Sequence, residues 1–170
     1  MHSISFPTRF LPGTTDNFVS NEVIAKDLTV FDIWHYLIDT AKWELYYDNA
    51  ANIKLTNGKN SELHYGEHFH FDTFGFPIDA QVMELISPTT DAPVARIAWN
   101  GWNNDSAESA IDVYHAFLIE QLPANRVRLL TQESQIGASA AKLAITKPNP
   151  MLNGHQAWLD GLVSAARKQL

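Results

Sequence analysis

The sequence contains no cysteine among its 170 residues, which excludes disulfide bonds and thiolate metal sites. Basic residues are scarce and unclustered: 12 Lys and Arg stand against 19 Asp and Glu, giving a formal net charge of −7. Binding to nucleic acid or to an anionic membrane requires a basic surface, so both partners are disfavoured. No apolar run approaches the roughly 20 residues of a membrane-spanning helix, and the first residues lack the pattern of a secretory signal. These absences predict a cytoplasmic protein without nucleic-acid partners and without membrane insertion.

Hydrophobic residues, by contrast, make up 45% of the chain and charged residues 18%. This is the balance of a globular protein, and the length favours one core rather than two. Two prolines and Gly13 predict an irregular N-terminal arm over residues 1–15. A single domain is expected over 16–170.

The domain opens with an extended segment over 16–24. Asp27 is the expected N-cap of an amphipathic helix over 28–37, and Asp39 or Thr40 can cap a second short helix. The second helix carries three aromatic residues that form either a lid over a cavity or part of the core: Trp43, Tyr46 and Tyr47.

Six further segments alternate between apolar and polar residues, which is the period of a half-buried strand. They are 52–55, 68–72, 78–82, 94–102, 110–120 and 126–136. The links between them are short, so neighbouring strands must pair in antiparallel fashion. Asn57-Gly58 and Gly75 are expected to form turns.

After Gly137 the pattern becomes helical, with a short helix over 138–143 and an interruption by two prolines over 147–150. From Met151 to the end, apolar residues recur at the i, i+3, i+4, i+7 spacing of one long amphipathic helix. The chain is therefore expected to adopt an α+β helix-grip fold. In this fold a seven-stranded curved antiparallel sheet, two short helices and a long C-terminal helix enclose an apolar cavity.

Strand alternation also assigns each residue to one of two sheet faces. The inner face is apolar except for four residues: Glu84, His115, Thr131 and Glu133. The outer face, expected to meet water, takes charged and polar residues of the last two strands together with a few apolar ones: Asp112, Glu120, Arg126, Arg128, Gln132, Ser134, Tyr114, Ala116 and Leu118.

The inward-facing polar residues permit two interpretations. With a tight hairpin over 121–125, His115 lies roughly opposite Thr131 and diagonal to Glu133, within side-chain reach. A buried carboxylate without a partner costs several kcal/mol, so Glu133 must be paired or face a wet cavity. His115 and Glu133 then either form a general acid–base pair in a ligand pocket, or are a satisfied core histidine and a carboxylate near solvent at the strand end.

A metal site is not expected. His68 and His70 have the spacing of two ligands on one strand face, but both point outward and no third ligand is identifiable. No phosphate-binding glycine loop is present either. The sequence thus implies neither a metal nor another cofactor.

Several short patterns follow one another in an order that resembles a known superfamily. They are Ile33-Trp34, Leu37, Asp39-Thr40 and Trp43, then Gly66, Phe69, Phe71 and Gly75, then Val82-Met83-Glu84-Leu85, Ile97-Ala98-Trp99, His115-Ala116-Phe117-Leu118, Gly137 and Trp158-Leu159. Over residues 18–168 the chain resembles START-like domains, the SRPBCC superfamily of polyketide cyclases/dehydrases and lipid-transport proteins. The resemblance implies a cavity for an apolar or amphipathic small molecule. It implies no single reaction.

The first hypothesis is therefore a protein that binds a lipid-, polyketide- or aromatic-like ligand. The residues expected at the pocket are Phe71, Trp99, His115, Phe117, Thr131, Glu133 and Trp158, because such sites combine apolar walls with a few convergent polar groups. The alternative is a cyclase- or dehydrase-type enzyme in which His115 or Glu133 moves a proton. A third hypothesis is a protein-interaction module, or a homodimer, that uses an apolar patch on the outer face around Tyr114, Ala116 and Leu118.

Overall fold

The computed structural model describes residues 1–56 and 60–168, so the turn expected at Asn57-Gly58 lies outside the described residues. Seven strands form one antiparallel sheet in the order β1-β7-β6-β5-β4-β3-β2. Their bounds are β1 Asn17–Lys26, β2 Ala51–Leu55, β3 His68–Thr73, β4 Phe76–Ile86, β5 Val94–Asn103, β6 Ile111–Leu122 and β7 Arg126–Ile136. Strands β2 to β7 follow one another along the sheet, and β1 joins the far edge beside β7.

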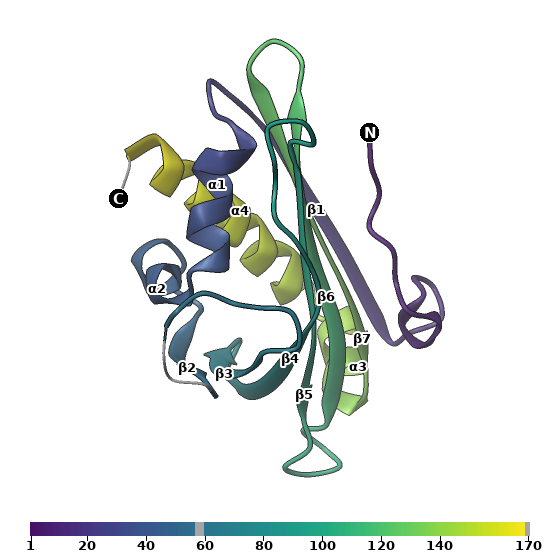
Figure 1. Cartoon of the computed structure of the whole chain (residues 1–170). Coiled ribbons are helices and arrows are strands. Elements are labelled where there is room, and N and C mark those ends of the chain that lie inside the picture. Colours follow the sequence, from purple (N-terminus) through teal and green to yellow (C-terminus); the bar gives the residue numbers. More distant parts are fainter. Residues whose placement is uncertain (57–59, 169–170) are drawn as a thin grey trace.

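The helices lie mainly on one side of this sheet, and the segment before β1 lies on the other (Figure 1). The helical elements are η1 Thr8–Phe10, α1 Val30–Ile38, η2 Thr40–Lys42, α2 Trp43–Tyr46, α3 Ala138–Ile145 and α4 Pro150–Lys168. The predicted α+β architecture, with a seven-stranded sheet and a long C-terminal helix, is confirmed. Within the described residues, no helix combines the length and apolarity that crossing a membrane requires.

The first helix begins at Val30, two residues later than expected. Thr29 is the N-cap of α1, because its side chain accepts from Asp32 N at 3.3 Å while Thr29 N donates to the Asp32 carboxylate at 2.7 Å. This reciprocal capping box satisfies two backbone N–H groups that the helix itself leaves free. Asp27 instead sits in a turn with φ 60° and donates its backbone N–H to the Asn125 carbonyl, so its prediction as the cap was wrong.

An aromatic cluster around Trp43 joins the helices to the sheet. Trp43 is fully buried, and its ring centroid lies 5.7 Å from that of Trp99 on β5 and 5.2 Å from that of Trp158 on α4. Tyr47 stacks on Trp158 at 4.4 Å. Helix α4 can approach this cluster closely because Gly161 has no side chain. A Cβ atom there would collide with the backbone of α2. These aromatic residues are therefore core packing and not a lid.

A β-bulge in β4 reverses the side on which Glu84 lies. Val82 pairs with Trp99, but the pairing shifts by one residue before Glu84, which pairs with Ala98. An extra residue exchanges the two faces of a strand because side chains alternate with a period of two. Glu84 therefore lies on the outer face, 3.8 Å from Arg96, and its assignment to the inner face was wrong.

The register of β6 and β7 also differs from the expectation. His115 lies directly opposite Glu133, and Thr131 lies opposite Phe117. The hairpin has three residues between the paired Leu122 and Arg126. The partner of each β6 residue is therefore two positions further along β7 than expected. The faces are unchanged, but His115 and Glu133 become nearest cross-strand neighbours.

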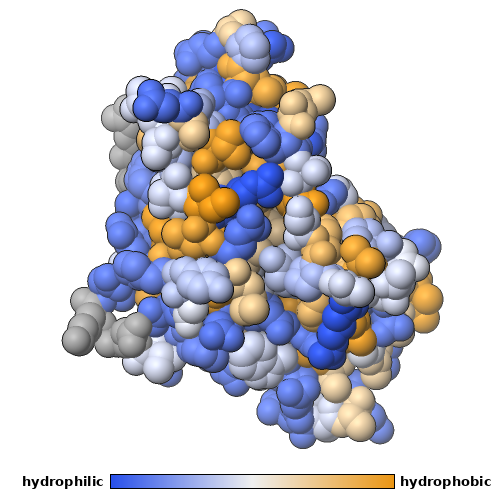
Figure 2. Space-filling view, turned by 45° about the vertical axis from the view of Figure 1, so that its right-hand side comes forward, coloured by the Kyte–Doolittle hydropathy of each residue, from blue (hydrophilic) through white to orange (hydrophobic). Residues whose placement is uncertain are grey.

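The outer face of the central strands is covered by the chain before β1. The rings of Phe6 and Phe10 contact that of Tyr114, with centroids 5.7 and 5.9 Å apart. Tyr114, Ala116 and Leu118 are all buried. The exposed patch expected there for a protein partner or a second copy is therefore absent from the described part of the chain. On the face shown in Figure 2, hydrophobic residues occur in groups separated by hydrophilic ones.

Polar residues of the same face are buried as well, which corrects their assignment to water. Glu120 and Arg128 are only 3% and 9% exposed, and their side chains pair at 2.7 Å. Arg128 also contacts Glu22 on β1, and the backbone of His2 both donates to Glu120 and accepts from Arg128. Ser134 is fully buried. The N-terminal arm thus turns a half-exposed sheet into one covered on both faces here.

Candidate functional site

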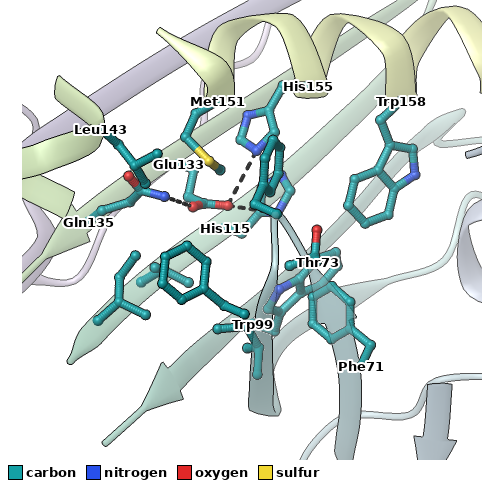
Figure 3. A pocket seen from close by; sticks show the side chains of 15 residues that line it. Phe71, Thr73, Trp99, His115, Glu133, Gln135, Leu143, Met151, His155 and Trp158 are labelled. Atoms are coloured by element: carbon teal, nitrogen blue, oxygen red, sulfur yellow. Dashed lines mark hydrogen bonds and ion pairs between the residues drawn. The ribbon is translucent and has the colours of Figure 1, made fainter. Parts of the chain in front are cut away.

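A small cavity lies between the inner face of the sheet and helix α4 (Figure 3). Its volume is about 30 Å³, which is room for one or two water molecules. Most of its wall is apolar, and its polar groups come mainly from β6, β7 and α4. The lining residues are Phe71, Thr73, Phe74, Phe76, Ile78, Trp99, Ile111, Val113, His115, Glu133, Gln135, Leu143, Met151, His155 and Trp158.

Five of the residues expected at the pocket line this cavity: Phe71, Trp99, His115, Glu133 and Trp158. Two others do not. Phe117 lies beneath the wall, with its ring centroid 5.7 Å from that of Trp99 and 5.2 Å from that of Trp158. Thr131 is fully buried behind His115. The structure thus contains an apolar cavity, but one much smaller than a lipid.

Glu133 is the centre of the polar end of the cavity. Its Oε2 atom lies 3.0 Å from His115 Nδ1 and 3.4 Å from His155 Nε2. All three side chains are buried, and the two imidazole rings are nearly parallel, with centroids 4.5 Å apart. The dashed lines in Figure 3 mark these contacts. Strands β6 and β7 and helix α4 each supply one member of this group, called the buried triad below.

Both nitrogens of His115 are engaged. Nε2 lies 2.8 Å from Thr131 Oγ1, which also lies 3.2 Å from the Ala116 carbonyl oxygen. The Thr131 hydroxyl has a single proton, which it can give to either of these acceptors. A neutral imidazole makes its strongest bond by donating to a carboxylate. We therefore assign the His115 proton to Nδ1, where it is donated to Glu133 across 3.0 Å, and Thr131 then donates to Nε2.

A chain of amide side chains holds the other oxygen of Glu133. Gln135 donates to Oε1 of Glu133, and Gln135 accepts from Asn17 at 2.6 Å. Asn17 accepts in turn from Asn149 at 3.1 Å, and the Asn149 side chain also accepts from the backbone N–H of Met151 in the first turn of α4. The orientation of the carboxylate is thus linked to β1 and to the start of α4.

Burial acts in opposite directions on the two ionisable groups that face each other across the strands. It lowers the pKa of His115 to about 3, although the Glu133 carboxylate opposes this shift and His155 adds to it. Burial alone would raise the pKa of Glu133, but His115, His155 and the bond from Gln135 outweigh it and lower that pKa. Near neutral pH the site therefore holds a carboxylate beside a neutral His115 imidazole.

His155 was missed as a member of the polar group. In the sequence it belongs to the apolar stripe of the last helix and to the residues that carry the START-like resemblance, and neither placed it beside His115. A polar residue on an apolar stripe is nevertheless the same signal that singled out His115. Its Nδ1 atom is buried and has no hydrogen-bond partner.

One ligand atom from each member of the buried triad lies within 4.8 Å of the others, so these three side chains could hold a metal ion. No sequence motif announces such a site, because the ligands lie on three separate elements. His68 and His70, the two histidines considered from the sequence, lie on the outer side of β3 as expected, and His70 contacts Asp72 and Asp79 there.

Comparisons with known proteins include a solved structure with high sequence identity to this chain. No family model and no curated protein matches the chain. Among solved structures, hypothetical protein jhp0584 from Helicobacter pylori is 47% identical over 98% of this chain and 97% of that chain, with a TM-score of 0.93. The chain belongs to the jhp0584 family. The description of this relative names no activity, so it supports the fold of the chain but assigns no function to it.

More distant solved structures agree on that fold. A START superfamily protein from Mycobacterium smegmatis has a TM-score of 0.54 at 12% identity, covering 90% of this chain and 99% of that one. The di-domain ARO/CYC BexL from the BE-7585A biosynthetic pathway has a TM-score of 0.58 at 7% identity, covering 87% of this chain and 45% of that one. The chain has the START-like helix-grip fold, as the resemblance in the sequence implied.

Proposed function

We propose that this protein binds a small, mainly apolar molecule in the cavity between the sheet and α4, with a polar end of the ligand at the buried triad. The observation that carries the proposal is the distribution of polarity along the cavity wall. Aromatic and aliphatic side chains form most of it, and Glu133 and His155 supply polar atoms at one end. Apolar walls with a few convergent polar groups are characteristic of small-molecule sites.

The size of the cavity constrains how the ligand enters. A space of about 30 Å³ does not accommodate an organic molecule without movement of the wall. Three lining residues lie outside the sheet and can move without breaking it: Phe74 in the β3–β4 turn, Leu143 on α3 and Met151 at the start of α4. Methionine adapts easily to new shapes because its side chain is unbranched. The ligand is expected to displace these side chains.

Native mass spectrometry of freshly purified protein tests the proposal, followed by titration with fatty acids of graded length and with aromatic ketones. A saturable probe is expected. Val113→Phe, which fills the cavity from β6, should weaken its binding at least tenfold. Met83→Phe adds comparable bulk at a position that is 44% exposed and should leave binding unchanged. The proposal fails if no probe saturates and no ligand co-purifies, or if Val113→Phe binds as the wild type does.

A second candidate function is proton transfer on such a ligand, as in a cyclase or dehydrase. It is favoured by the 3.0 Å contact between His115 and Glu133, which meets the distance required of an acid–base pair. His155, which lines the cavity beside this pair, is then the group that contacts the substrate. Conversion of the bound probe, followed by mass spectrometry, should occur with the wild type and stop in Glu133→Gln. Binding of the probe without its conversion would contradict the enzymatic function and leave ligand binding as the proposed function.

A further inference from the structure

We propose that the buried triad of His115, Glu133 and His155 binds one divalent transition-metal ion of the kind that prefers nitrogen and oxygen ligands, such as Zn²⁺ or Fe²⁺. This site goes beyond ligand binding in the cavity and does not depend on it. Two imidazoles and one carboxylate, without a thiolate, form a ligand set that suits these ions and not Ca²⁺ or Mg²⁺.

The first argument concerns the contact between His115 and Glu133. His115 Nδ1 and Glu133 Oε2 lie 3.0 Å apart with one proton between them. A metal ion bound to both atoms would take the place of that proton. His115 would then carry its proton on Nε2 and donate it to Thr131 Oγ1, which lies 2.8 Å away.

The second argument concerns charge. The Glu133 carboxylate is 5% exposed, and its side-chain contacts among the described residues are two histidines and the neutral Gln135. Neither Lys nor Arg of the described chain pairs with it. A buried carboxylate requires a compensating positive charge or several hydrogen bonds to avoid a penalty of several kcal/mol. A divalent cation supplies that charge at the place where the three side chains meet.

The distances fit an ion of this kind. Zinc lies about 2.0 to 2.2 Å from nitrogen and oxygen ligands, so neighbouring ligand atoms in a tetrahedral site are about 3.4 Å apart. The two contacts of Glu133 Oε2, at 3.0 and 3.4 Å, are close to this value. Small rotations of the side chains bring all three ligand atoms, now within 4.8 Å of one another, around one ion.

The surroundings of the ligands match those of known metal sites. Metal-binding histidines usually donate their second N–H to an oxygen that fixes the ring, and bound carboxylates are themselves hydrogen-bonded. Thr131 provides that oxygen for His115, and Gln135 holds the second oxygen of Glu133. Three protein ligands leave at least one coordination position open. The cavity beside the triad has room for a water molecule or a ligand atom there.

Metal titration of untagged protein, first freed of metal with EDTA and then dialysed, tests the proposal. Zn²⁺ is followed by calorimetry and Co²⁺ by its visible absorption. One equivalent of each is expected to bind. An excess of about 100 times the dissociation constant should raise the thermal midpoint by roughly 5 to 10 °C, whereas Mg²⁺ should not. Absence of stoichiometric binding of both Zn²⁺ and Co²⁺ overturns the proposal whatever the outcome of the ligand experiments.

Variants locate the ion. Glu133→Gln and His155→Gln should abolish the stoichiometric binding. Thr131→Val should weaken it about 10- to 100-fold, as loss of such a supporting bond does elsewhere, and Thr131→Ser should restore it. His70→Gln is the matched control, because His70 with Asp72 and Asp79 is a surface group of similar composition. Loss of binding in His70→Gln instead of the triad variants overturns the proposal. If Glu133→Gln does not fold, the two Thr131 variants decide.

Discussion

At the scale of single residues, Glu120 and Arg128 form a charged pair beneath the N-terminal arm. The Arg128 side chain is held by Glu120 at 2.7 Å and by Glu22, and the backbone of His2 closes the group. Burial by itself would raise the pKa of Glu120, but the bonds from His2 and the pairing with Arg128 overcome it and lower that pKa to about 2. The carboxylate therefore stays charged in the folded protein well below the pH at which it would be protonated in the unfolded chain.

Glu120→Gln is expected to lower the free energy of unfolding at pH 7 by about 2 to 3 kcal/mol, somewhat less than for a fully buried pair because Glu22 still faces Arg128. A group whose pKa falls on folding stabilises above its unfolded value and loses that effect as the pH falls towards its folded value. The difference between wild type and variant should therefore shrink between about pH 5 and pH 2. Urea unfolding across this range measures it.

Exposed Glu44 provides the control for this prediction. Glu44→Gln on α2 should change the free energy of unfolding by less than about 0.5 kcal/mol. A difference between wild type and Glu120→Gln that stays constant with pH would show that Glu120 contributes packing and not charge.

At the scale of elements, the capping box of Thr29 and Asp32 fixes where α1 begins. Thr29→Ala should lower the free energy of unfolding by about 1 kcal/mol, because the backbone N–H of Asp32 loses its acceptor. Thr29→Ser keeps the hydroxyl and should stay near the wild type. Urea unfolding compares the three proteins. Equal midpoints for Thr29→Ala and the wild type would contradict the role of the cap.

Element boundaries were largely predictable where alternation was regular. The last strand was expected over 126–136 and is found as Arg126–Ile136. Alternation also predicted correctly which sheet face a residue occupies, except after the bulge in β4. No feature of the local sequence predicts that bulge. Cross-strand register failed by two residues at the last hairpin, because register depends on the number of turn residues and not on alternation.

The candidate site shows the same division. Parity placed His115 and Glu133 on the inner face, since a polar residue among apolar ones is visible in the sequence. Their contact with His155 could not be predicted in this way. It depends on how α4 packs on the sheet, and the periods of strands and helices do not specify that packing. The cavity volume depends on how the lining side chains fill the space, and sequence patterns contain no information on it.

At the scale of the whole molecule, the N-terminal arm covers the sheet face opposite the helices. Its apolar residues Phe6 and Phe10 stand in a segment with prolines and without a regular period, so no pattern predicted their docking. They form a second, smaller core with Tyr114 and Ala116. The fold is therefore stabilised from both sides of its central strands.

Deletion of residues 1–15 should lower the thermal midpoint and promote self-association, because it exposes Tyr114 and Ala116 and leaves Glu120 without the backbone of His2. Contiguous exposed apolar surface favours association. Light scattering coupled to size-exclusion chromatography, with thermal melts, measures both effects. Phe6→Ala and Phe10→Ala should show a weaker form of the same change. An unchanged midpoint and molecular mass after the deletion would contradict it.

The bulge in β4 also gives this strand an unequal tolerance of changes in length. Removal of Met83 would restore simple alternation and leave Glu84 opposite Ala98 on the outer face. Addition of a residue would instead reverse the faces of the rest of the strand. Exchanges at exposed Met83 and its loss should therefore be tolerated, whereas gain of one residue should not. Natural relatives are expected to vary at this position or to lack it, but not to be longer here.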